Sequence, residues 1–182
     1  PDGSLQPMAH GAQSLAPGTV TFKNVYGSAT AQNINTGTSE EIDEETVLTE
    51  GFVIFTNSDG YLDMVFSNGV VARLSPNSRL EIESFATSEG RADRDARMDI
   101  SRARNRTTAS QAQLRLHLTC GDILVNAVEK TEGQLRVRTE TTQVDSQLTK
   151  FFVSHGRTTG ETRSMTRAIN LASENTTVSS TM

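Results

Sequence analysis

The sequence of 182 residues contains no tryptophan, only 5% aromatic residues and a single cysteine, Cys120. One cysteine excludes a disulfide within the chain. No run of about twenty apolar residues occurs, so we expect no transmembrane helix. No basic stretch followed by an apolar one marks a signal peptide in the residues from Pro1 onward.

Positive charge is also scarce, because acidic residues outnumber basic ones and the formal net charge is −5. A general nucleic-acid binder neutralises phosphates with Lys and Arg, so nucleic acid is not an expected partner, and acidic membranes are disfavoured for the same reason. The length suits one domain with tails. Hydrophobic residues make up 35% of the chain, which favours a thin β architecture.

Catalytic and metal-binding motifs are missing as well. The three histidines, His10, His117 and His155, are expected in a leader, on the polar face of a strand and in a loop, without a metal-ligand neighbour at a useful spacing. His117 and Cys120 would point to opposite faces of a strand. We therefore predict no catalytic residue, no metal ligand and no cofactor; only a hydrolase with a dispersed site stays open.

Strand signals are present instead. In residues 60–80, GYLDMVFSNGVVARLSPNSRL, apolar side chains alternate with polar ones between turn signals, as in half-buried strands of a meander. Asp59-Gly60 and Asn68-Gly69 are expected to supply positive φ at tight reversals, and Pro76, Asn77 and Ser78 to form a further turn. The residues expected to be buried are Leu62, Met64, Phe66, Leu74, Leu80, Ile82, Leu114, Leu116, Ile123, Val125, Leu135 and Val137.

The rest of the chain divides around these strands. We expect a flexible leader over residues 1–17, a β domain over 18–160 and Ser/Thr-rich edge strands or a tail over 161–182. Residues 36–51 are acidic and are compatible with a solvated loop or with a helical turn capped by Ser39. Residues 113–119 and 121–129 are expected to form two strands. Between them, Cys120 would be a small buried or half-buried thiol at a strand end; an intermolecular disulfide is the alternative.

An arginine-rich insertion occupies residues 88–110 and has little apolar periodicity. It is interpreted either as a solvated loop or hairpin, or as a surface that grips carboxylates or phosphates of a partner. Its candidate partner-binding residues are Arg91, Arg94, Arg97, Arg102, Arg104 and Arg106.

The order of the strand segments over about residues 19–154 resembles the FecR domain of bacterial envelope proteins. The motif residues that carry the resemblance are Gly60, Asn68, Gly69, Leu74, Pro76, Asn77, Ser78 and Gly121. The resemblance implies an all-β fold of stacked short antiparallel strands, either β-solenoid-like or a β-roll or sandwich. It also implies a periplasmic or secreted location, reached by export with removal of a signal peptide.

The resemblance favours a non-enzymatic binding or sensor module that signals through a protein partner in the cell envelope. A carbohydrate or surface-polymer binder is the alternative, although such proteins usually display exposed aromatic side chains. Function follows only weakly from fold.

Overall fold

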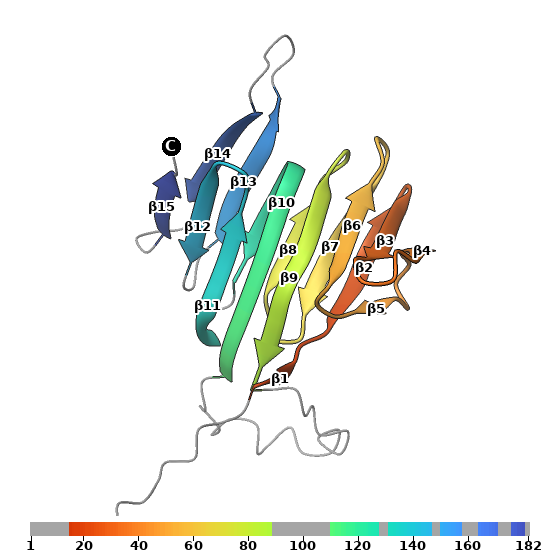
Figure 1. Cartoon of the computed structure of the whole chain (residues 1–182), viewed down its shortest axis with the longest axis horizontal. Helices are drawn as coiled ribbons and strands as arrows, with labels where there is room; N and C mark the ends of the chain where they lie inside the picture. Colours follow the sequence, from red (N-terminus) through yellow and green to blue (C-terminus); the bar gives the residue numbers. More distant parts are fainter. Residues whose placement is uncertain are drawn as a thin grey trace, which may run out of the picture.

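The computed structural model describes residues 15–88, 110–127, 131–146, 150–157, 164–170 and 176–180. Every regular element in these ranges is a β-strand, so the predicted all-β class is confirmed. The strands join into one strongly curled sheet, a half-barrel whose two arms enclose the core (Figure 1).

The two arms share one long central strand, β10 (Ser110–Asn126). In arm A, the strands around the first half of β10 are β4 (Ser39–Glu41), β3 (Ala29–Asn33), β6 (Phe52–Thr56), β9 (Arg79–Thr87), β11 (Thr131–Arg138), β12 (Thr142–Ser146) and β15 (Thr176–Ser180), with β1 (Ala16–Pro17) beside the end of β9. In arm B, the strands around the second half are β5 (Val47–Leu48), β2 (Val20–Tyr26), β7 (Tyr61–Phe66), β8 (Val71–Leu74), β13 (Lys150–Arg157) and β14 (Ser164–Asn170).

The strand β10 passes from arm A to arm B at Gly121. Before Gly121 it pairs with β9 and β11, and from Gly121 onward it pairs with β8 and β13. The expectation of two separate strands here was therefore wrong. The next strand, β11, returns to arm A and runs parallel to the first half of β10, whereas the other pairings of the described strands are antiparallel. This return makes one solenoid-like coil in an otherwise antiparallel sheet.

The inward faces of both arms are apolar, as the alternation in the sequence predicted. All twelve residues that were expected to be buried are at most 6% exposed, and they belong to a single hydrophobic cluster. Phe66 of arm B and Phe85 of arm A meet edge to face within this cluster, with ring centroids 5.5 Å apart. The two arms are therefore packed directly against each other through this core.

The hairpin between β7 and β8 turns at Asn68 and Gly69. The amide of Gly69 donates to the carbonyl of Phe66 at 2.8 Å, and the amide of Phe66 donates to the carbonyl of Val70 at 2.9 Å. Only Gly69 of this pair has a positive φ, of 88°. The loop is thus a tight turn followed by a glycine bulge, for which a glycine in the left-handed region is preferred.

The expectation of a positive φ at Gly60 was wrong. The backbone approaches Gly60 closely instead, because a Cβ at this position would overlap the carbonyl oxygen of Ser28. On the facing segment, Gly27 has a φ of 64°, and a Cβ there would overlap the carbonyl of Asp59. A glycine is required at position 60 because a side chain would collide with the neighbouring backbone, and not because of an unusual backbone conformation.

The turn between β8 and β9 carries the chain from arm B back to arm A. Asn77 adopts a φ of 54°, and its amide donates to the carbonyl of Asn57 at 3.1 Å. The buried hydroxyl of Ser78 donates to the carbonyl of Pro76 at 3.3 Å and accepts the amide hydrogen of Asp122 at 3.1 Å. This turn is therefore fastened to β10 beside the point where β10 itself changes arms.

Two ranges depart from the sequence-based expectations, residues 1–17 at the start of the chain and the acidic residues 36–51. Ala16 and Pro17 pair with β9 as β1, so the sheet begins within the range expected to be a leader. Ser39 lies in β4 and caps no helix; residues 36–51 instead contain β4, a turn around Asp43 and β5.

Cys120 and His155 also differ from expectation. Cys120 lies inside β10 rather than at a strand end, and its side chain is exposed. His155 lies in β13 rather than in a loop, and it is only 2% exposed. Burial lowers the pKa of His155, a change that Glu140 opposes and His117 reinforces. Cys120 was thus expected to be at least half-buried and is exposed, whereas His155 was expected in a loop and is buried.

Candidate binding surface

The outward face of arm B carries a tyrosine–arginine cluster, which consists of Tyr26, Tyr61, Asp63 and Arg73. The rings of Tyr26 and Tyr61 stack with their centroids 4.7 Å apart, and the guanidinium carbon of Arg73 lies 5.4 Å from the centre of the Tyr61 ring. Asp63 accepts hydrogen bonds from Nε and Nη2 of Arg73, at 2.6 and 2.8 Å. A third bond, 2.9 Å long, comes from Nδ2 of Asn24. These contacts hold all four side chains in one arrangement.

Asp63 is the electrostatic centre of this cluster. The hydrogen bonds from Arg73 hold the pKa of the Asp63 carboxyl below its ordinary value, burial opposes them, and the bond from Asn24 lowers the pKa further. The same pairing raises the pKa of Arg73. Both groups are therefore charged at neutral pH, although the side chain of Asp63 is only 13% exposed.

We expect Asp63→Asn to lower the free energy of unfolding at pH 7 by about 1 kcal/mol, because it removes a charge-assisted bidentate pair whose arginine is half exposed. The folded-state pKa of Asp63 is depressed, so this stabilisation is complete above the unfolded pKa of about 3.9 and is lost as pH falls through the folded pKa. Urea unfolding of both proteins at pH 7 and in strong acid measures this difference.

The control for this prediction is Asp145→Asn, because Asp145 also pairs with an arginine, Arg136, but is 42% exposed. We expect it to cost no more than about 0.5 kcal/mol. An Asp63→Asn penalty that stayed the same in strong acid would contradict the assignment of the stabilisation to the ionised carboxylate.

Half-buried apolar side chains continue the outward face of arm B beyond the cluster. Val65 of β7 pairs with Val71 of β8. Leu124 of β10 lies between Arg73 on one side and Phe152 of β13 on the other. Tyr26, at 53% exposure, is among the most exposed large apolar side chains of the described residues. The face therefore combines aromatic, aliphatic and arginine side chains, the composition of protein-binding surfaces.

The residues that the sequence predicts to bind a partner are not among those of the tyrosine–arginine cluster. The arginine-rich insertion falls outside the described residues over 89–109, and with it Arg91, Arg94, Arg97, Arg102, Arg104 and Arg106. The strands that flank it pair with each other up to Thr87 and Ala112, so the insertion connects two adjacent strands of arm A. The family-motif residues are brought to the turns and to the β10 crossing, namely Gly60, Asn68, Gly69, Pro76, Asn77, Ser78 and Gly121.

The sequence analysis missed the tyrosine–arginine cluster, although a signal for part of it exists. Asp63 and Arg73 stand at equal sequence distances from Asn68, the centre of the hairpin turn, and a hairpin places such positions opposite each other. Tyr26 has no comparable signal, because a register shift between Lys23 and Tyr26 brings it to Tyr61. That shift is visible only in the folded sheet.

Comparison with known protein families identifies the domain. The family model described as "FecR protein" matches residues 52–166, a range that begins with β6 and includes Tyr61, Asp63 and Arg73. The chain belongs to the FecR family. FecR proteins are sensor and signalling proteins of the cell envelope, generally without catalytic activity, and their FecR domains are typically periplasmic.

Neither a search among curated proteins nor one among solved structures found a match to this FecR-family chain. Within the ranges that the structure describes, there is no helix with the length and apolar character that a membrane crossing requires.

Proposed function

We propose that this FecR-family chain is a sensor or binding module of a bacterial envelope protein, and that it acts through protein–protein contacts on the outward face of arm B. The observation that carries the proposal is the tyrosine–arginine cluster, which is exposed at Tyr26 and fixed at Arg73. Tyrosine and arginine are enriched among the residues that contribute most to protein binding.

The scaffold beneath the cluster supports this role. Asp63 holds Arg73 through two hydrogen bonds, and stacking orders Tyr26 on Tyr61. Side chains that are already ordered before binding lose less conformational entropy when a partner docks. The face is therefore prepared for a partner without rearrangement of the sheet.

The arginine-rich insertion is proposed as a second contact for an acidic partner. Its arginines outnumber its acidic residues in a chain whose net charge is −5. Guanidinium groups bind carboxylates in a bidentate manner. Attraction between opposite charges also makes two proteins associate faster at low salt than at high salt.

Carbohydrate binding is the second candidate, and the exposed ring of Tyr26 favours it, because sugars stack on aromatic side chains. Both rings of the pair are already engaged, however: Tyr61 contacts Tyr26 and Arg73. A protein partner would contact Arg73 as well as the two rings, so we favour protein binding over carbohydrate binding.

A photo-crosslinking amino acid at position 26 tests the proposal in envelope fractions from the native organism. We expect it to capture a defined protein, and Arg73→Ser to reduce that partner's affinity by at least tenfold while the far-ultraviolet spectrum is unchanged. The matched control, Arg115→Ser, removes an exposed arginine from the outward face of arm A and should leave the affinity unchanged.

Substitution of Arg94, Arg97, Arg102 and Arg104 by serine measures the contribution of the insertion separately. We expect it to weaken binding of the same partner more at low salt than at high salt, with little change in stability. Equal crosslinking from positions 26 and 115, or capture of glycan alone, would reject the proposed protein-binding surface.

A further inference from the structure

A β-bulge in β9 brings two glutamates together on the outward face of arm A. Glu81 pairs with His117 of β10, and Ser84 pairs with Arg115, while the register between them shifts so that Glu83 has no partner on β10. Glu83 is therefore the extra residue of the bulge, and it points outward like Glu81. Bulges of this kind often redirect a side chain at a functional site.

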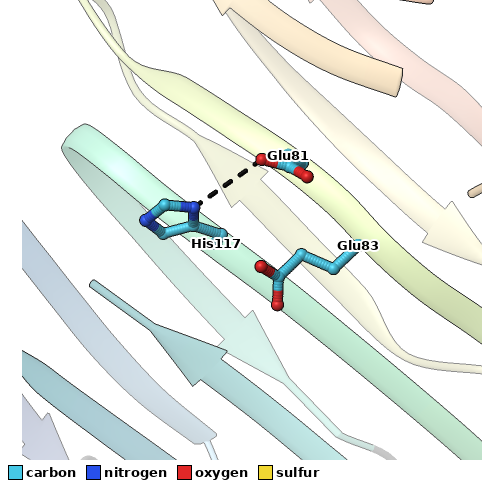
Figure 2. A group of neighbouring side chains, drawn as sticks. All are labelled: Glu81, Glu83 and His117. Carbon is cyan, nitrogen blue, oxygen red and sulfur yellow. Dashed lines mark ion pairs between the residues drawn. The ribbon is translucent and has the colours of Figure 1, made fainter. Parts of the chain in front are cut away.

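The bulge completes a cluster of Glu81, Glu83 and His117. Figure 2 shows the imidazole of His117 facing both carboxylates, which come from the neighbouring strand. The potential ligand atoms of the three side chains all lie within 4.8 Å of one another, and Nδ1 of His117 is 3.7 Å from Oε2 of Glu81. The side chains are sheltered rather than open to solvent, with exposures of 16% for His117, 30% for Glu81 and 22% for Glu83.

The imidazole of His117 adds an independent indication of a ligand. Both of its ring nitrogens are shielded from solvent, and neither makes a hydrogen bond with any part of the chain that the structure describes. Buried polar atoms are nearly always paired, and an exception calls for a bound ion or another partner. A metal ion between the imidazole and the two carboxylates would supply that partner for Nδ1, the ring nitrogen that lies 3.7 Å from Oε2 of Glu81.

We propose that Glu81, Glu83 and His117 bind a divalent transition-metal ion, and that Zn²⁺ is the ion that this donor set fits best. Zn²⁺ takes imidazole nitrogen and carboxylate oxygen at about 2.0–2.2 Å, often with water in a remaining position. Ligand atoms around such an ion are separated by about 3.5 Å, so small side-chain rotations close the present cluster onto it. The imidazole disfavours Ca²⁺ and Mg²⁺, which prefer oxygen ligands.

Arg138 of β11 is compatible with this site. It donates hydrogen bonds from Nε and Nη2 to Oε1 of Glu83, the first of them 2.6 Å long, which leaves Oε2 for the ion. A residue that fixes a ligating carboxylate from outside is a regular feature of metal sites. The site lies on the outward face of arm A, so the proposal of metal binding does not depend on the proposal that a partner binds to arm B.

Isothermal titration of the full chain with zinc chloride tests the site. We expect one saturable ion per chain and a loss of affinity of at least tenfold in His117→Gln and in Glu83→Gln, because each variant removes one ligand. The matched controls are His10→Ala and Cys120→Ser, which remove an imidazole and the thiol that do not belong to the cluster; both should bind zinc as the wild type does. Calcium chloride at the same concentration should not displace the zinc.

Two further readouts keep the test decisive if a variant folds poorly. In the wild type, added zinc should shift the imidazole NMR signals of His117 but not those of His155, and the thermal midpoint should rise with zinc concentration. Absence of saturable binding would overturn the proposal, as would wild-type affinity in both ligand variants or loss of binding in either control.

Discussion

Replacing Phe85 by alanine is expected to lower the free energy of unfolding by about 3–5 kcal/mol. Phe85 is fully buried, and its ring meets Phe66 edge to face at 5.5 Å across the core. The ring also fills the space in front of Gly18, where a Cβ would overlap it. Alanine would therefore leave a cavity between the two arms at a point where both contribute to the wall, and the backbone has little freedom to close it.

Phe152→Ala is the control for this prediction, because it removes the same ring from a half-buried position on the outward face of arm B. Its expected cost is about 1 kcal/mol, in proportion to the smaller apolar area that is buried. Urea unfolding followed by circular dichroism measures both variants. A loss of less than about 1.5 kcal/mol in Phe85→Ala would show that the arms are held together elsewhere.

The core was predictable because alternation alone determines which side chains of a strand face inward. Leu62, Met64 and Phe66 alternate with outward residues up to a turn, and all three are buried. The same rule, applied to Phe151 and Val153, also predicts that His155 faces inward. The polar character of histidine led to its assignment to a loop, although the period placed it in the core.

Bulges account for most of what the sequence analysis missed. Alternation from Leu118 would turn Cys120 inward, but a register shift between these two residues turns it outward. The bulge at Glu83 was indicated by the three-residue step from Ile82 to Phe85, both of which are buried. Glu81 and Glu83 are not close to His117 along the chain and reach it only from the adjacent strand, so spacing in the sequence gives no sign of this cluster.

The break assumed after Cys120 has a different origin. Glycine weakens a strand and often interrupts it, so the sequence around Gly121 predicted two separate strands. In the structure, Gly121 has a φ of 93° and allows one strand to continue from arm A into arm B. The sequence identifies the need for an unusual backbone conformation there, but it cannot distinguish a reversal from a crossing, because that depends on which strands pair on each side.

This crossing gives the second large prediction. Gly121→Ala is expected to lower the free energy of unfolding by about 3–5 kcal/mol, from two additive causes. A φ of 93° is unfavourable for any L-residue with a side chain. A Cβ at this position would also overlap the hydroxyl of Ser78 and lie 2.5 Å from its Cα. Relief of that overlap would pull Ser78 away from the amide of Asp122, which it binds at 3.1 Å, and would open the turn between β8 and β9.

Gly69→Ala separates the two causes. Gly69 has nearly the same φ, 88°, but a Cβ there would meet nothing within 4 Å, so its replacement carries only the backbone strain, about 1–2 kcal/mol. The difference between the two variants in urea unfolding measures the close approach of β10 to the turn at Ser78. Ser78→Ala should then lower the cost of Gly121→Ala in the double variant, because it removes the hydroxyl that the new methyl group would strike. Equal losses in Gly121→Ala and Gly69→Ala would mean that β10 does not pass over Ser78 as the structure has it, and that the connection between the arms lies elsewhere.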